Sequence, residues 1–130
     1  AFDANSWISC AIGKKLAGLE RLALHPRLRV LCCEELIEEF RDVSQRPAVA
    51  KYIPPNSAML VESILHQLTQ IKLSDSEGVV RDPKDEYLIA LSFQENLDYL
   101  VTNDQDLLSI GRYHGTVFIR YTDFLNLLDE

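Results

Sequence analysis

The chain has 130 residues and a mass of 14.8 kDa, the size of one ordinary domain, so we expect a single domain over residues 1–130. Hydrophobic residues make up 47% and charged residues 25%, which excludes collagen-like, disordered and mini-protein classes. The net charge of −7 argues against a nucleic-acid partner that binds a basic surface, unless clustered acids hold divalent cations that reverse the local charge.

Several features indicate a cytoplasmic protein without a membrane span. Stretches without a charge fall far short of the ~18 apolar residues that a span needs, and the N-terminus lacks a basic region followed by an apolar one. The cysteines and histidines show no zinc-binding spacing. We therefore expect the cysteines to be buried and the histidines to lie at the surface or to cap turns. Phe2-Asp3 resembles the end of a strand, and we therefore expect further residues upstream of Ala1.

The first half of the chain predicts helices with one strand between them. Apolar spacing predicts a helix over 11–24, a strand over 29–33 and a helix over 34–44. Arg46-Pro47 breaks that helix, and Pro54-Pro55 introduces another over 56–70.

The second half alternates strands and helices. A strand over 71–73 and a polar loop over 74–81 precede a helix with Asp82 as N-cap and Pro83 at its first position. A strand over 99–101, a helical turn at 107–108 closed by Gly111, a strand over 117–119 and a helix over 122–128 capped by Thr122 follow. This alternation predicts an α/β fold with three layers, α/β/α, in which helices cover both faces of a mainly parallel sheet of about 4–5 strands.

Acidic residues fall where such a sheet places its chemistry. Asp3 ends the first strand, Asp104 follows the strand over 99–101, and Asp82 and Asp85 open the helix that leads into that strand. Taken singly, Asp82 and Asp104 are explained as caps and Asp85 as part of a capping box. A buried Asp3 without a partner is costly, and ligands in α/β folds bind beyond the carboxyl ends of the strands. Jointly, these positions favour a site.

Helical geometry selects one further acid from the helix over 34–44. At 100° per residue, Glu38 lies about 170° from the centre of the apolar face and Glu39 about 90° from it. Glu38 therefore faces solvent, whereas Glu39 lies at the rim of the core. Four converging carboxylates repel one another by up to about 4 kcal/mol for each close pair. Divalent cations relieve this repulsion, and a ligand set made only of oxygen favours Mg²⁺ or Mn²⁺.

Four segments, taken in order, resemble the successive motifs of the PIN domain family, and in particular those of the bacterial toxin-component subgroup of VapC-like ribonuclease toxins. They are Asp3–Ser9, Glu35–Phe40 followed by Arg46-Pro47, Arg81–Glu86 and Val101–Leu108. The resemblance runs from residue 2 to about residue 125. It implies an endonuclease that cuts single-stranded RNA with a metal-activated water, using one or two Mg²⁺ or Mn²⁺ ions, as the toxin of a toxin–antitoxin pair.

The resemblance also implies roles for individual residues. The catalytic and metal-binding acids are Asp3, Glu39, Asp85 and Asp104, with Asp82 and Asp106 as accessory metal ligands and with Asn5 and Thr102 as hydrogen-bond partners of the carboxylates. Basic residues near the acids are candidate phosphate contacts, namely Arg46, Lys51, Arg81 and Lys84. Ser92 stands where the family more often has Ala. The expected partners are RNA, an antitoxin protein and a second copy of the chain in a homodimer.

Two other interpretations stay open. In a phosphoacceptor or phosphohydrolase, a strand-end Asp acts as the nucleophile, but the early pair of acids and the late Lys of a receiver domain are not visible. The chain is alternatively a non-catalytic PIN-like module that binds RNA or a protein. The complete set of acids argues against this second interpretation.

Overall fold

A computed structural model describes residues 1–13, 21–23, 25–74 and 83–128, and the side chains of residues 83–86 are not among the described ones. The chain divides into two compact units. The first unit joins Ala1–Ser6 to Leu73–Glu130, and the second consists of Trp7–Lys72. The single domain expected over residues 1–130 stays a prediction.

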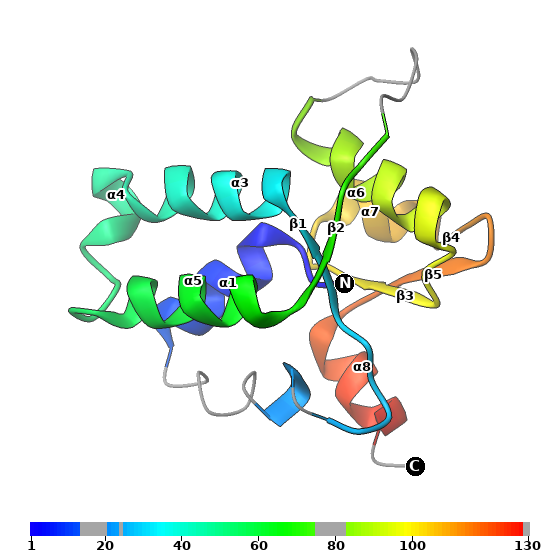
Figure 1. Cartoon of the computed structure of the whole chain (residues 1–130), viewed down its shortest axis with the longest axis horizontal. Helices are drawn as coiled ribbons and strands as arrows, with labels where there is room; N and C mark the ends of the chain where they lie inside the picture. Colours follow the sequence, from blue (N-terminus) through cyan, green and yellow to red (C-terminus); the bar gives the residue numbers. More distant parts are fainter. Residues whose placement is uncertain (14–20, 24, 75–82, 129–130) are drawn as a thin grey trace. The chain divides into compact units, whose positions relative to one another are not determined.

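The first unit contains a three-stranded mixed sheet. Its elements are α6 (Pro83–Glu95), β3 (Tyr99–Val101), α7 (Gln105–Ile110), β4 (Arg112–Tyr113), β5 (Thr116–Ile119) and α8 (Tyr121–Leu128). The strand order is β3-β5-β4, with β3 parallel and β4 antiparallel to β5 (Figure 1). Phe2 extends this sheet by a parallel bridge to Val101. The Phe2 segment, β3 and β5 therefore run parallel to one another, and Asp3 directly follows the bridged residue Phe2.

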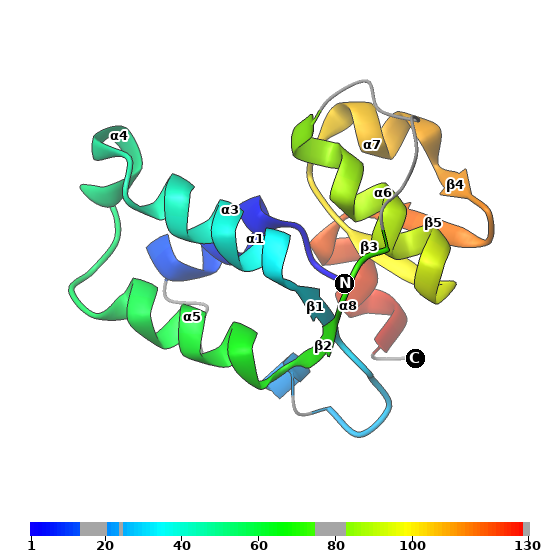
Figure 2. The same ribbon diagram turned by 45° about the horizontal axis from the view of Figure 1, so that its top comes forward.

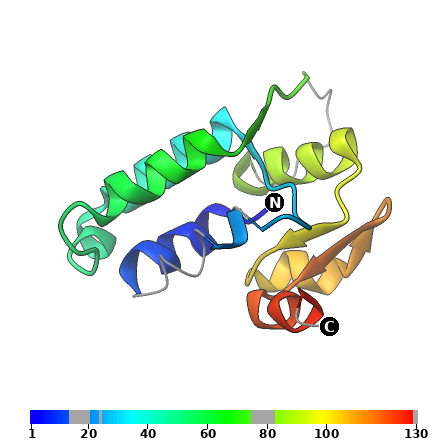
Figure 3. The ribbon, with the colours of Figure 1, turned by 60° about the horizontal axis from the view of Figure 1, so that its bottom comes forward.

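Helices cover both faces of this sheet. Leu100 and Phe118 are paired across β3 and β5, and with Leu88 of α6 and Leu107 of α7 they form a buried cluster on one face. On the other face, Phe124 of α8 meets the ring of Tyr99, with centroids 5.5 Å apart. Figure 3 shows α6 and α8 on opposite sides of the strands. Each buried Leu or Phe contributes about 1.5 to 3 kcal/mol, so this core fixes the strand ends that carry the acids.

A tight turn explains the antiparallel strand β4. His114 and Gly115 join Tyr113 to Thr116 and have positive φ angles of 47° and 90°. Positive φ at both positions is typical of a two-residue type I′ hairpin, which only an antiparallel pair can use. The chain therefore reverses here without the long crossover that a parallel strand requires.

The second unit packs helices beside a two-stranded parallel sheet. Its elements are β1 (Leu31–Cys33), α3 (Glu34–Ser44), α4 (Pro47–Ala50), α5 (Ser57–Gln67) and β2 (Thr69–Ile71), together with most of α1 (Ala4–Ile12). Helices α3 and α5 lie side by side (Figure 2). They bury Phe40 and Leu65 completely, and β1 is buried along its whole length. The two acids in the first turn of α3 favour its start, because the helix dipole is positive there.

Several predicted elements are confirmed. The α/β class holds, α3 and β3 have the predicted bounds, and α6 begins at Pro83. Gly111 ends α7 with a φ of 75°. The cysteines are buried, and His25 accepts a hydrogen bond from the Arg27 N–H as a turn cap. None of the helices in the described part of the chain is long and apolar enough to span a membrane.

Other predictions are wrong in extent or kind. The predicted sheet of 4–5 mainly parallel strands is not present in the described residues, which form one two-stranded parallel sheet and one three-stranded mixed sheet. Strands β1 and β2 are Leu31–Cys33 and Thr69–Ile71 rather than 29–33 and 71–73, and α5 ends at Gln67 because β2 begins earlier. Thr122 lies inside α8 and does not cap it, since the Phe124 N–H already donates to the Arg120 carbonyl at 2.9 Å.

Most of the predicted helix over 11–24 lies outside the described residues, and helix α1, which begins before it, is not among the predicted elements. Helix α1 begins at Ala4, and residues 21–23 are also helical, while 14–20 and 24 lie outside the described residues. Ala4, Trp7, Ile8 and Ala11 are all buried and have the spacing of a helical face. This spacing is the local signal in the sequence that indicates α1.

Candidate active site

Asp3 lies at the end of the N-terminal strand segment and at the start of α1. The Asp3 N–H donates to the Val101 carbonyl at 3.0 Å, which fixes the backbone next to β3. The Asp3 carboxyl group is the N-cap of α1, because its Oδ1 accepts the Ser6 N–H at 2.8 Å. The same oxygen accepts the Ser6 hydroxyl at 2.6 Å. The residue is only 5% exposed, so these hydrogen bonds replace the water that burial removes.

Thr102 joins Asp3 to the loop after β3. Its buried hydroxyl donates to Asp3 Oδ2 at 2.5 Å and accepts the Asp104 N–H at 3.0 Å. The Thr102 N–H donates to the Ile119 carbonyl at 2.9 Å, so β5 holds the residue in place. One hydroxyl thus connects the two acids that follow neighbouring parallel strand segments.

Asp104 is half-buried and caps α7. Its Oδ1 accepts the N–H of Asp106 at 2.8 Å and, at a longer 3.4 Å, that of Leu107. The capping role proposed from the sequence is therefore present. Asp106 is exposed in the first turn of the same helix. Because Oδ1 makes both capping bonds, Oδ2 of Asp104 is the oxygen more open to a further ligand.

The donor set suits a hard cation. Asp3 and Asp104 offer carboxylate oxygens at the carboxyl ends of neighbouring parallel strand segments, and such oxygens are the ligands that Mg²⁺ and Mn²⁺ prefer. Among the side chains that the structure describes, which exclude those of residues 83–86, no group of three or more acidic, His or Cys residues is arranged to hold a metal. The assignment of Asp3 and Asp104 as metal ligands therefore stays a prediction.

Other predicted ligands and contacts lie beyond what is described. Arg81 and Asp82 are outside the described residues, and for Lys84 and Asp85 only the backbone, in the first turn of α6, is described. Their assignment as ligands and phosphate contacts stays a prediction.

Glu39 belongs to the second unit. It is half-buried on α3 between the buried Leu36 and Phe40, whereas Glu38 is exposed. This burial agrees with the helical geometry that selected Glu39 over Glu38. The role of Glu39 as a ligand stays a prediction.

The candidate phosphate contacts in the second unit are exposed and have local partners. Arg46 forms an ion pair with Asp42 at 2.9 Å, one helical turn earlier. The Lys51 ammonium lies 5.1 Å from the centre of the Tyr52 ring. Both contacts lie at the surface, where such pairs contribute little to stability, so both cations can turn to a phosphate at small cost.

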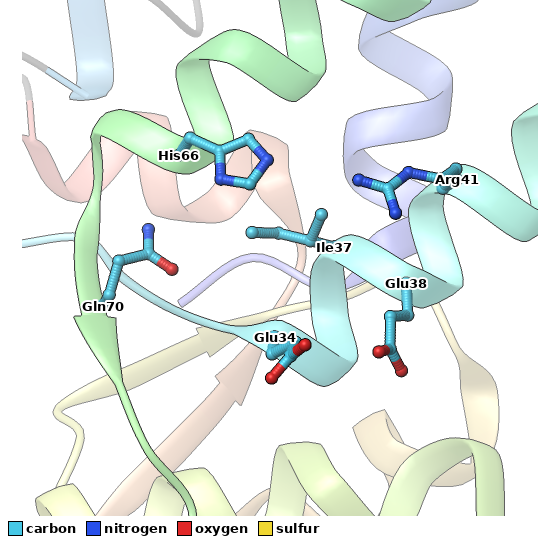
Figure 4. A pocket seen from close by; sticks show the side chains of 6 residues that line it. All are labelled: Glu34, Ile37, Glu38, Arg41, His66 and Gln70. Atoms are coloured by element: carbon cyan, nitrogen blue, oxygen red, sulfur yellow. The ribbon is translucent and has the colours of Figure 1, made fainter.

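A cavity of about 230 Å³ lies beside α3 but contains none of the predicted catalytic acids. Figure 4 shows its lining from α3, from the end of α5 and from β2. The lining residues are Glu34, Ile37, Glu38, Arg41, His66 and Gln70. Arg41 also pairs with Glu62 of α5, an arrangement that lowers the pKa of the Glu62 carboxyl group.

Ser6 is not among the partners of Asp3 predicted from the sequence. The predicted partner Asn5 is exposed in the structure. The missed signal is local, because Ser6 stands three residues after Asp3, where the backbone N–H of a helix meets its N-cap. With the start of the helix at Ala4, this spacing identifies Ser6.

Comparison with known proteins gives one match. A family model described as the PIN domain matches residues 1–106. This span contains Asp3, Glu39, Asp85 and Asp104. No curated protein and no solved structure matches the chain.

Proposed function

The chain belongs to the PIN domain family, and on this premise we propose that it is a Mg²⁺- or Mn²⁺-dependent endoribonuclease that cuts single-stranded RNA. PIN domains are generally nucleases that act on RNA or DNA and usually use Mg²⁺ or Mn²⁺. The observation that carries the proposal is the Thr102 hydroxyl, which donates to the Asp3 carboxyl group and accepts the backbone N–H of Asp104 at the carboxyl ends of neighbouring strand segments.

In this proposal, Asp3, Glu39, Asp85 and Asp104 hold the cation, and Asp82 and Asp106 assist them. A bound divalent cation supplies the positive charge that activates water and stabilises the leaving oxygen of a phosphodiester.

The chain's own groups orient this site. Thr102 fixes Asp3 Oδ2 through a 2.5 Å hydrogen bond, and α7 fixes Asp104 through its capping bonds. Preorganised carboxylates need little rearrangement when a ligand arrives.

Substrate binding in this proposal relies on a few basic side chains, because the chain as a whole is acidic, with a net charge of −7. The assigned phosphate contacts are Arg46, Lys51, Arg81 and Lys84. Two of them, Arg46 and Lys51, are exposed in the structure. A cation held by the acids reverses the local charge and favours the approach of a phosphate.

The family resemblance further supports a biological role. We propose that the protein is the toxin of a toxin–antitoxin pair and acts in the cytoplasm, either as a homodimer or covered by its antitoxin. The exposed apolar side chains of Tyr52, Met59 and Leu60, which are 60%, 72% and 53% exposed, support a protein partner.

The test is cleavage of a 5′-labelled single-stranded RNA with Mg²⁺ or Mn²⁺, with excess EDTA, and with the Asp104→Asn protein. We expect cleavage only with the metal ion and the wild-type chain. Cleavage that continues undiminished in EDTA refutes the metal-dependent mechanism. RNA binding without cleavage under all conditions favours the non-catalytic module.

A further inference from the structure

Ser6 makes two contacts with one oxygen of Asp3. Its backbone N–H lies 2.8 Å and its hydroxyl oxygen 2.6 Å from Asp3 Oδ1. The backbone contact is the ordinary N-cap bond of α1, and any residue except Pro can make it at this position. The hydroxyl contact depends on the side chain, and it is the shorter of the two.

The remaining capacity of the Asp3 carboxyl group follows from its lone pairs. An ionised carboxyl group has about four acceptor sites on its two oxygens. Ser6 occupies both sites of Oδ1, and Thr102 occupies one site of Oδ2. Among these contacts, Oδ2 keeps the capacity for one further ligand and Oδ1 keeps none.

The burial of Asp3 makes its hydrogen bonds to Ser6 and Thr102 hard to replace. Asp3 is 5% exposed, so water does not readily replace a lost hydrogen bond. Donors at both oxygens also fix the rotation of the carboxyl plane, because turning it breaks the bond to Ser6 or to Thr102. Asn5, the neighbour expected to orient the carboxylate, is exposed.

We propose that Ser6 is a positioning residue, whose hydroxyl occupies Asp3 Oδ1 and thereby presents Oδ2 as the single oxygen through which Asp3 binds a divalent cation. This inference rests on the proposed function, since it assumes that Asp3 is a metal ligand. Hydrogen-bond partners of ligating carboxylates typically change metal affinity by about 10- to 100-fold when they are removed.

The test measures Mn²⁺ affinity of the full chain by titration calorimetry and by electron paramagnetic resonance, without RNA. Ser6→Ala removes the hydroxyl, whereas Ser6→Thr retains it. Ser9→Ala is the matched control, because Ser9 is exposed on the same helix. We expect a dissociation constant about 10- to 100-fold weaker for Ser6→Ala, and values within about threefold of wild type for Ser6→Thr and Ser9→Ala.

Wild-type Mn²⁺ affinity in the Ser6→Ala protein overturns the inference while leaving the proposed function intact. Failure of the wild-type chain itself to bind Mn²⁺, or binding that Asp3→Asn leaves unchanged, overturns both. Melting temperature in EDTA is recorded for each protein, since a merely structural role moves that value and leaves Mn²⁺ affinity unchanged. If Ser6→Ala does not fold, Ser6→Cys, whose thiol is a weak donor, takes its place, and affinity equal to that of Ser6→Thr overturns the inference.

Discussion

Replacing Asp104 with Asn separates its two roles in the structure. As the cap of α7, Asp104 uses Oδ1 to accept one good hydrogen bond at 2.8 Å and one long one at 3.4 Å. The Asn side chain keeps an acceptor oxygen and is about as good an N-cap as Asp. It carries no charge and is a poor ligand for a hard cation, so only the metal-binding role is lost.

The expected magnitudes differ sharply between stability and activity. With EDTA present, Asp104→Asn should change the free energy of unfolding by less than about 0.5 kcal/mol, whereas Asp104→Ala loses both capping bonds and should cost about 0.5 to 2 kcal/mol. Cleavage should fall at least about 100-fold in both variants, because even the loss of a partner outside the ligand shell costs 10- to 100-fold.

Urea unfolding monitored by circular dichroism and cleavage of labelled RNA in Mn²⁺ measure these two quantities. Cleavage by Asp104→Asn at the wild-type rate, together with a destabilised Asp104→Ala, would show that Asp104 is only a cap. The reasoning that places the active site after β3 would then be refuted.

Further predictions concern the second acid, the metal and the thiols. Glu39→Gln should be inactive and Glu38→Gln fully active in the cleavage assay, and equal activity of the two variants would contradict the choice of Glu39. Mn²⁺ at a hundredfold excess over its dissociation constant should stabilise the fold by about 2.7 kcal/mol in calorimetry, and an unchanged melting temperature would count against a bound metal. Burial raises the pKa of Cys32 to about 12 and of Cys33 to about 11, from an ordinary 9.0, so both thiols should resist a disulfide reagent at pH 8 until urea unfolds the chain. Since both pKa values are raised, their contribution to stability is complete below pH 9 and is lost as pH rises through 11 to 12, which urea midpoints at pH 8 and pH 10.5 will detect.

Much of the fold follows from local patterns in the sequence. Helix α3 is predictable because its apolar face, its acidic first turn and the Pro47 that follows it agree with one another. Strand β4 is not predictable in this way, because it has two residues and its pairing depends on the positive φ of His114, which is unusual for a residue other than Gly. Helix α1 was missed because the Leu spacing further along the chain gave a stronger pattern than Trp7, Ile8 and Ala11.

The candidate site also has one part that the sequence predicts and one part that it does not. Strand ends alone predict that Asp3 and Asp104 lie in neighbouring loops, because parallel strands present their carboxyl ends at one edge. The hydrogen bond from Thr102 to Asp3 spans 99 positions along the chain, and it requires the register of β3 against the N-terminal segment. No local pattern in the sequence predicts that register, so the hydrogen bonds that connect the two acids are seen only in the folded structure.

The most direct test of a metal site at Asp3 and Asp104 is an anomalous difference map from a crystal soaked in Mn²⁺. We predict a peak about 2.1 Å from Asp3 Oδ2 and at a similar distance from a carboxylate oxygen of Asp104. A map with no peak at these two residues, or with its peak only beside Glu34 and Glu38 in the cavity next to α3, would contradict it.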